Sequence, residues 1–161
     1  MSLITLRAFL DSYEIRYIVI SHSVGYTAQG IAALAHVSGK ELAKTVIVKL
    51  DGKMVMAVLP ASYHVDLELL KVAAGAGSAE LASERDFRGR FADCETGAMP
   101  PFGNLYAMPV YVDETLTRDK EIAFNAGTHR ELVRMAWRDF QKLVEPKIVR
   151  FAAGQIPGKA A

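Results

Sequence analysis

The feature that most constrains the fold is a pair of apolar runs joined by a turn. Thr45–Leu50 and Met54–Leu59 lie on either side of Asp51-Gly52, a dipeptide that strongly favours a two-residue hairpin. Both runs are almost continuously apolar, so neither shows the alternation of a strand with one wet face. We therefore expect a hairpin that lies centrally in a sheet covered on both faces, with Pro60 at its end.

The rest of the chain predicts a mixture of helices and short strands. Apolar residues at helical spacing, together with capping residues and glycines, predict helices over 2–13, from Thr27 to Gly39, from Asp66 to Ala74 and from Ser83 to Phe91. β-Branched and aromatic residues predict short strands at Tyr17–Ile20, Val110–Asp113 and Glu121–Phe124.

One segment fits two structures equally well. Residues 128–131 (Thr-His-Arg-Glu) match a capping box, which would begin a long helix with an apolar stripe that extends to Leu143. The same stretch allows a strand over Glu131–Met135, followed by a helix that begins near Trp137. Both alternatives remain open. Either gives an α+β domain whose sheet is mixed and mainly antiparallel, with roughly six or seven strands.

Length and composition indicate one globular domain. The 161 residues are 51% hydrophobic and 23% charged, which suffices to bury a core and excludes a disordered chain. We expect a single domain over residues 1–153 and a flexible tail at 154–161. There is no apolar run of about 18 residues and no signal-peptide pattern, and the lone Cys94 fits a reducing compartment. We therefore expect a cytoplasmic protein that has no membrane partner.

The near balance of charge limits how the protein can meet nucleic acid. There are 19 basic and 18 acidic residues, which gives a net charge of +1. A protein that coats a duplex carries a clear basic excess, because it neutralises many phosphates. Any contact with nucleic acid is therefore expected to be small, such as one strand end or a few phosphates.

The usual catalytic and cofactor motifs do not occur in the sequence. The four histidines form no H-x-x-x-H pair and the single cysteine forms no C-x-x-C pair, so no metal site is expected. There is no P-loop, no G-x-G-x-x-G and no G-x-S-x-G elbow, and we expect no cofactor. Cys94 is more often a small buried group than a nucleophile, because nothing near it in sequence would activate its thiol.

Two features remain as candidates for a binding site. Lys44 stands at the mouth of the most apolar strand, where its ammonium could pair with a phosphate as a point charge. A solvated lysine at a strand end is the alternative. The loop from Gly97 to Pro101 combines a glycine with tandem prolines, so it can hold backbone N–H and C=O groups as fixed dipoles near a ligand. A merely rigid connection is the alternative for this loop.

Taken in order along the chain, these segments resemble one known family. Lys44 and Thr45 open the apolar hairpin TVIVKLDGKMVMAVLP, and VDLELLKVAAG, TGAMPPFG, PVYVDETL and NAGTHRELVRM follow it. The segment TGAMPPFG contains a G-x-x-x-P loop, with Phe102 and Gly103 directly after it. Blocks in this order and spacing over about residues 17–145 are similar to the YbaK family, also called the prolyl-tRNA-synthetase-associated editing domain.

This resemblance implies a fold and an activity. The fold is a compact α+β domain with a twisted, barrel-like sheet flanked by helices. The activity is trans-editing, in which a free-standing enzyme hydrolyses the ester between a wrong amino acid and the 3′-terminal adenosine of tRNA. The partner that follows is the acceptor end of tRNA, with an aminoacyl-tRNA synthetase as a further candidate. No cofactor and no metal are implied.

Carried over residue by residue, the resemblance implies roles for particular positions. Lys44 would contact the phosphate of the terminal nucleotide, and backbone groups of Gly97 and Ala98 would polarise the ester carbonyl. Gly127 would close the far wall of the aminoacyl pocket, and His129 lies where some subfamilies have a pocket histidine. The other residues assigned to substrate binding are Thr27, Met99, Pro100, Pro101, Phe102 and Gly103.

The expected mechanism is substrate-assisted hydrolysis without a catalytic side-chain base. The vicinal 2′-hydroxyl would orient or activate water, and Met99 and Pro100 would limit the pocket to a small amino acid such as alanine, serine or cysteine. Two rival functions remain: a non-catalytic binder of tRNA ends or aminoacyl-adenosine that acts as a regulator or synthetase partner, and a hydrolase of another small ester or amide.

Overall fold

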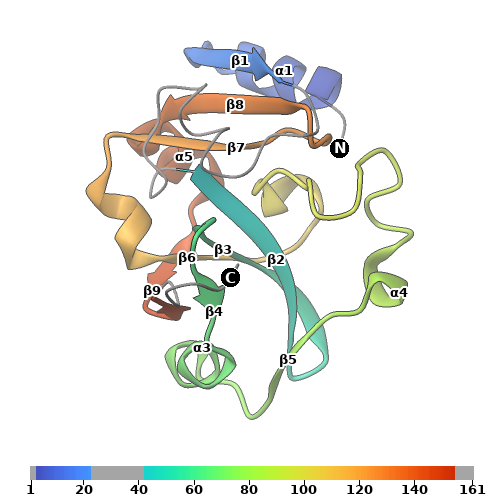
Figure 1. Ribbon diagram of the computed structural model, residues 1–161, viewed down its shortest axis with the longest axis vertical. Coiled ribbons are helices and arrows are strands. Elements are labelled where there is room, and N and C mark those ends of the chain that lie inside the picture. Colours follow the sequence, from blue (N-terminus) through green and yellow to red (C-terminus); the bar gives the residue numbers. More distant parts are fainter. Residues whose placement is uncertain (1–2, 23–41, 155–161) are drawn as a thin grey trace.

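The computed structural model describes residues 3–22 and 42–154 (Figure 1). The helix expected from Thr27 to Gly39 lies outside these residues, and so does the expected tail beyond Gly154. Within the described residues, none of the helices has the length and apolar character needed to cross a membrane.

Short helices and strands follow one another along the described chain. The helical segments are α1 (Leu3–Ser12), α3 (Leu67–Ala74), α4 (Glu84–Phe87) and α5 (Trp137–Val144), with 3₁₀ turns η1 (Gly103–Leu105) and η2 (Glu114–Arg118). The strands are β1 (Tyr17–Ser21), β2 (Leu42–Leu50), β3 (Lys53–Pro60), β4 (His64–Val65), β5 (Ala79–Leu81), β6 (Val110–Asp113), β7 (Glu121–Asn125), β8 (Glu131–Ala136), β9 (Lys147–Val149) and β10 (Ala152–Ala153).

Most of the strands form one mixed sheet of 8 strands. Its order is β1-β8-β7-β2-β3-β6-β9, with β5 paired to β2 off this path. The pairs β2–β7, β3–β6 and β6–β9 are parallel and the other pairs are antiparallel. The predicted α+β class and mixed sheet are confirmed. The sheet has more strands than expected because β5 and β9 are only 3 residues long and leave no pattern in the sequence.

The predicted hairpin is confirmed as the centre of this sheet. Asp51 and Gly52 connect β2 to β3 with φ angles of 52° and 81°. Two left-handed residues in a two-residue loop form a type I′ turn, whose twist matches that of the strands. The neighbouring residues Ile47 and Val48 point to opposite faces, and each belongs to a different buried cluster. The hairpin is therefore covered on both faces, as its apolar sequence predicts.

The segment that fitted two structures in the sequence is a strand. β8 pairs with both β1 and β7, and α5 begins only at Trp137. The Thr128 hydroxyl donates to the Glu131 carboxylate at 3.1 Å and accepts from the N–H of Arg130 at 3.2 Å. The side chains that match a capping box therefore close a turn before β8 instead of beginning a helix.

The helix predicted over Ser83–Phe91 is shorter than expected. Ser83 caps it as predicted, in a capping box shared with Asp86, but α4 ends at Phe87. Gly89 follows shortly afterwards, and glycine disfavours a helix because it loses the most backbone freedom there. The chain then turns, and the rings of Phe87 and Phe91 pack in a T-shaped arrangement with centroids 6.0 Å apart.

Asp113 attaches the C-terminal segment to the sheet. It is 1% exposed, and its Oδ1 accepts from the N–H groups of Phe151 and Ala152, each at 2.8 Å. Its Oδ2 accepts from the N–H of Thr115 at 3.1 Å and from the Thr115 hydroxyl at 2.6 Å. Burial alone would raise the pKa of Asp113, but these hydrogen bonds more than offset it and the pKa lies below its ordinary value.

We predict that Asp113→Asn lowers the free energy of unfolding by about 2–4 kcal/mol, because an amide cannot accept from all these donors and leaves some unpaired in the interior. Because the folded-state pKa of Asp113 is depressed, its stabilisation should be present above a pH of about 4 and be lost as the pH falls below it.

Urea unfolding at neutral and acidic pH measures both effects. Glu80→Gln, an exposed carboxyl-to-amide change on β5, is the matched control. Equal unfolding midpoints for the two variants would contradict the role given to Asp113.

Candidate active site

Two loops that are far apart in the sequence are joined by backbone hydrogen bonds. We call residues 95–98 and 127–129 the loop pair. The N–H of Glu95 donates to the carbonyl of Gly127 at 2.8 Å, and the N–H of Gly127 donates to the carbonyl of Ala98 at 2.9 Å. Because the two bonds run in opposite directions between the loops, neither loop can shift without the other.

The side chains of Glu95 and His129 add two further bonds to the loop pair. The Glu95 carboxylate accepts from the N–H of His129 at 2.8 Å, and Nε2 of His129 lies 2.8 Å from the carbonyl oxygen of Thr96. A carbonyl oxygen can only accept, so this Nε2 carries a proton and donates. The imidazole therefore holds the loop in place with one of its nitrogens.

Both loops depend on a glycine in the left-handed conformation. Gly97 has a φ of 84° and Gly127 a φ of 96°, values that other residues rarely adopt. A Cβ at Gly97 would lie 3.5 Å from Cε1 of His129, which is an ordinary contact. Glycine is therefore required at this position by the backbone conformation and not by a lack of space for a side chain. Gly97 is exposed and Gly127 is buried, so Gly97 is the glycine that a ligand can reach.

The residues after Gly97 anchor the loop in the core. Phe102 is fully buried, and its ring packs against Phe124 at 5.5 Å and Phe140 at 5.4 Å between centroids. A Cβ on Gly103 would lie only 2.2 Å from the carbonyl oxygen of Met108, so this glycine serves close backbone packing. The structure thus gives Phe102 and Gly103 a supporting place beneath the loop, and their contact with substrate stays a prediction.

The backbone donors of the loop are not equally available. The N–H of Ala98 donates to the carbonyl of Glu95 at 3.0 Å, within the turn. Pro100 and Pro101 have no N–H. The N–H of Gly97, in contrast, has no acceptor among the described residues. The N–H groups of Thr96 and Met99 also have no acceptor among these residues. Gly97 is thus an exposed and available backbone donor, whereas the N–H of Ala98 serves the turn.

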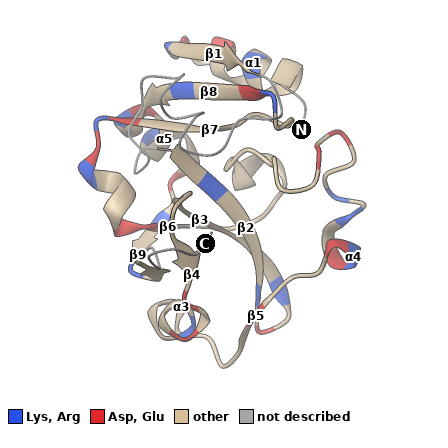
Figure 2. Cartoon of the chain, in the orientation of Figure 1, with Lys and Arg blue, Asp and Glu red and all other residues tan. Residues whose placement is uncertain are grey.

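Lys44 lies inside β2 and not at its mouth, since the strand begins at Leu42. Lys44 and Lys49 are the basic residues of β2, and Figure 2 shows basic segments on this otherwise uncharged strand. The side chain is half-buried, and within residues 3–22 and 42–154 no carboxylate pairs with it. Burial lowers the pKa of Lys44 below its ordinary value. A half-buried ammonium without a counter-ion is costly to the fold and is typical of a group that meets a charged ligand.

Asn125 is a candidate site residue that the sequence did not reveal. β7 runs parallel to β2, and Ala43 lies opposite Phe124. Continuing this register by one residue places Lys44 beside Asn125, with both side chains on the same face of the sheet. The Oδ1 of Asn125 is buried and has no hydrogen-bond partner in the described part of the chain. Buried polar atoms are nearly always paired, so this acceptor requires an explanation. Its signal in the sequence is one amide directly after the apolar run Ile122–Phe124.

A cavity of about 300 Å³ lies beside the first loop and is lined by Met99, Thr96 and Cys94, with residues of α4 opposite. The Cys94 sulfur is 3.5 Å from the hydroxyl of Tyr106, whose pKa is raised by burial and by this contact. The Cys94 thiol also donates to Oδ1 of Asp93 at 3.9 Å. Among the described residues no three His, Cys, Asp or Glu side chains come close enough to hold a metal ion.

The structure sorts the predicted site residues into three groups. Hydrogen bonds of the loop pair bring together Gly97, Ala98, Gly127 and His129. The buried base of the loop contains Met99, Pro100, Pro101, Phe102 and Gly103. Lys44 lies on β2, beside the strand that leads to Gly127, and Thr27 lies outside the described residues.

Comparison with known protein families agrees with this geometry. The family model of the aminoacyl-tRNA editing domain matches residues 22–143, which is most of the chain. The chain belongs to the aminoacyl-tRNA editing domain family. The resemblance found in the sequence is thereby confirmed.

One similar protein was found by sequence and another by structure. The multifunctional Ser/Thr-tRNA deacylase ProXp-y of Escherichia coli K12 is 28% identical over 149 residues, with 89% of each chain covered. The crystal structure of a candidate trans-editing enzyme for prolyl-tRNA synthetase superposes with a TM-score of 0.81 at 17% identity, over 94% of this chain and 97% of that one. At this level of identity the structural similarity shows that the two proteins share a fold.

We predict that Lys44→Met retains or raises the free energy of unfolding at neutral pH, because it removes an unpaired ammonium from a half-buried position and keeps the length of the side chain. The lowered pKa of Lys44 means that the unfolded chain binds this proton more tightly. The wild type should therefore gain stability as the pH rises toward 10.5, and the variant should not.

Urea midpoints at neutral and alkaline pH test this, with the exposed Lys142→Met on α5 as the control. A loss of more than about 1 kcal/mol in Lys44→Met alone would mean that the ammonium has a structural partner.

Proposed function

We propose that this protein is a trans-editing aminoacyl-tRNA deacylase, which removes a wrong amino acid from the 3′ end of tRNA. The loop pair is the observation that carries this proposal. It offers a fixed backbone donor, and the strand that leads into it, β7, places Asn125 beside the half-buried Lys44. An aminoacyl ester is already activated, so orientation and electrostatic stabilisation are the main contributions that its hydrolysis requires.

The chemical step is the addition of water to the ester carbonyl carbon. The oxyanion that forms accepts a hydrogen bond from the N–H of Gly97, which the turn holds in one orientation. The bond to the ribose 3′-oxygen then breaks, and this oxygen takes up a proton. Removing a donor of this kind from other hydrolytic enzymes costs about a hundredfold or more in rate, so one well-placed N–H is a substantial contribution.

The proton transfer is assigned to the substrate's own 2′-hydroxyl, which lies next to the ester. Asn125 supports this assignment because its buried Oδ1 needs a donor. A ribose hydroxyl that donates to Asn125 is held in place and can orient the attacking water with its own oxygen. His129 is a positioning residue in this scheme, since its Nε2 proton is engaged with Thr96.

Lys44 is assigned to the phosphate of the terminal nucleotide. Its ammonium lies beside Asn125 along the parallel strands β2 and β7, so phosphate and ribose would be held by neighbouring residues. A phosphate would supply the counter-ion that the half-buried ammonium lacks among the described residues. The overall charge of +1 agrees with a contact that is limited to the acceptor end.

The substrate class is a small amino acid of the alanine, serine or cysteine type. Met99 and Pro100, at the buried base of the loop, are assigned to set the volume of the pocket. The name of the E. coli relative, a Ser/Thr-tRNA deacylase, supports a small side chain. Sterics can exclude a larger amino acid, whereas one missing methylene is worth only about 1–3 kcal/mol in binding, which is why a second selection step is useful. An aminoacyl-tRNA synthetase that supplies mischarged tRNA is the second candidate partner.

The decisive experiment is deacylation of tRNAs charged with alanine, serine, threonine or cysteine. We predict hydrolysis of at least one of them, and a fall of about 10–100-fold in kcat/KM for Lys44→Met, because one charge-assisted contact to phosphate is lost. Lys142→Met, an exposed lysine on α5, should retain the wild-type rate.

Two outcomes would contradict the proposal, and each would favour a different function. Binding of tRNA ends without hydrolysis of any ester would favour a non-catalytic regulator. Equal hydrolysis of aminoacyl-tRNA and simple amino acid esters would favour a general esterase that uses the same loop pair.

A further inference from the structure

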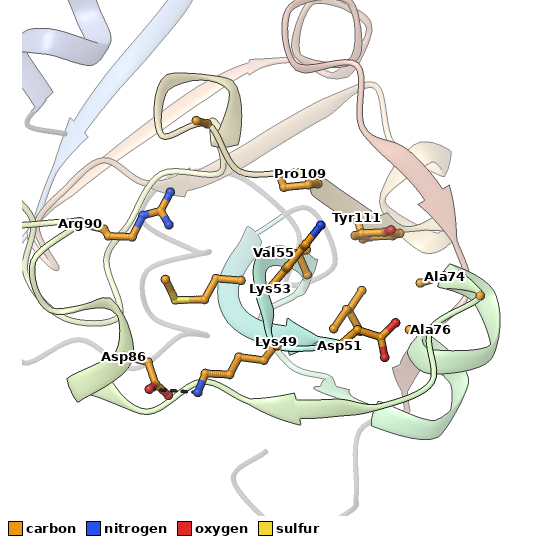
Figure 3. Close-up of a pocket in the computed structure, with 15 residues that line it drawn as sticks. Lys49, Asp51, Lys53, Val55, Ala74, Ala76, Asp86, Arg90, Pro109 and Tyr111 are labelled. Atoms are coloured by element: carbon orange, nitrogen blue, oxygen red, sulfur yellow. Dashed lines mark ion pairs between the residues drawn. The ribbon is translucent and has the colours of Figure 1, made fainter.

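A cavity lies at the tip of the β2–β3 hairpin, and its lining includes no residue of the loop pair (Figure 3). Its volume is about 590 Å³, within the range of about 300–1,000 Å³ that is typical of small-molecule sites. Leu50, Val55 and Tyr111 give it an apolar floor, and Pro109 forms an exposed wall. The editing chemistry proposed above makes no use of this cavity.

Two cations face this cavity from opposite sides. Figure 3 shows Lys53 extending toward Pro109 and Tyr111, with Arg90 across the cavity from it. The Arg90 Nη2 donates to the backbone carbonyl of Tyr106 at 2.8 Å. In the described part of the chain neither Lys53 nor Arg90 has a carboxylate partner. A third cation lies nearby, because Nζ of Lys147 is 5.4 Å from the centroid of the Tyr111 ring.

The acidic residues at this cavity are engaged elsewhere. Asp86 accepts from the backbone N–H of Ser83 and pairs with Lys49 at 3.0 Å, and these contacts lower the pKa of Asp86 to about 2. Asp51 accepts from the N–H groups of Gly77 and Ser78, each at 2.9 Å. Asp51 keeps its negative charge, so the charged side chains that line the cavity (Lys49, Asp51, Lys53, Asp86 and Arg90) sum to +1.

The edge of β3 adds backbone hydrogen-bonding groups to the cavity. The N–H of Met56 points outward and donates to the carbonyl of Pro109 at 2.9 Å, where β6 begins to pair with β3. Residues two apart in a strand direct their backbone groups to the same side, so the N–H and C=O of Met54 also point outward. β6 does not extend to Met54, which leaves this donor and acceptor at the cavity.

We propose that this cavity binds a nucleotide, at a site separate from the editing site. The phosphate lies between Lys53 and Arg90, which offer charge-assisted hydrogen bonds. The base lies on the apolar floor, where its polar edge meets the N–H and C=O of Met54. An extended peptide fits less well, because only Lys53–Val55 precede the β6 pairing and this edge is too short for an added strand.

The same chemistry could come from a free nucleotide or from one nucleotide of an RNA strand. Titrations of the full-length protein with AMP and with a five-nucleotide oligoadenylate separate these sources, followed by ¹H–¹⁵N chemical shifts of Gly52, Met54 and Ala107. Saturable shifts at these amides with either probe support the proposal. AMP binding as tight as that of the oligonucleotide identifies a free nucleotide, and tighter oligonucleotide binding identifies RNA.

Charge reversal tests the assigned contacts. Lys53→Glu combined with Arg90→Glu should weaken binding at these amides at least tenfold, because two contacts to phosphate become repulsive. Arg138→Glu combined with Lys142→Glu, both exposed on α5, applies the same change in charge elsewhere and should leave binding unchanged. Lys44→Met should also leave it unchanged, so this readout is independent of deacylation.

Three results would overturn the proposal. The first is no saturable shift at millimolar concentrations of either probe. The second is equal binding by the wild type and the charge-reversed variant. The third is displacement of AMP by inorganic phosphate or an acidic peptide at the concentration at which AMP itself binds, which would mean that the base contributes nothing.

Discussion

The hydrogen bonds between Gly127 and residues 95–98 hold together the parts that the candidate active site uses. Alone, each loop would be a turn whose glycine could leave the left-handed conformation at little cost. Joined to each other and anchored by the buried residues that follow Ala98, the two loops fix the direction of the Gly97 N–H. A dipole that is oriented in advance needs no reorganisation when charge develops on a substrate. This is the physical reason why such a site can act on an activated ester without a nucleophile–base pair.

The central sheet connects this backbone site to the charge on β2. The parallel pairing of β2 with β7 places Lys44 beside Asn125, and the chain reaches Gly127 only two residues later. Within the described residues the Lys44 ammonium and the Asn125 amide oxygen have no partner. Such groups on one face of a sheet reduce stability, and folds retain them mainly where a ligand uses them. The apolar hairpin compensates with core on both faces. The same hairpin supports the second cavity at its opposite end, where the remaining cations meet an open strand edge.

Much of the fold could be predicted because its signals are local. The Asp51-Gly52 hairpin and the Asp66-capped helix each contain their own turn or cap, and the family resemblance identified the loop at Gly97. The sequence did not decide between strand and helix for Glu131–Ala136, because the turn before it also matches a capping box and one of its two partner strands, β1, lies more than a hundred residues earlier. Asn125 was missed for a similar reason. A sequence pattern does not show that the amide oxygen of Asn125 is buried without a partner among the described residues. It also does not show that the N–H of Ala98 is used within its own turn.

The central claim is that the substrate's 2′-hydroxyl, and no protein side chain, manages the proton during ester hydrolysis. The most direct test compares seryl-tRNA that ends in adenosine with seryl-tRNA that ends in 2′-deoxyadenosine, under single-turnover conditions with saturating enzyme. Loss of a positioned proton-transfer group should slow hydrolysis of the deoxy substrate by about a hundredfold or more, with little change in binding. Equal single-turnover rates would contradict the claim and would mean that a side chain such as His129 acts as the base.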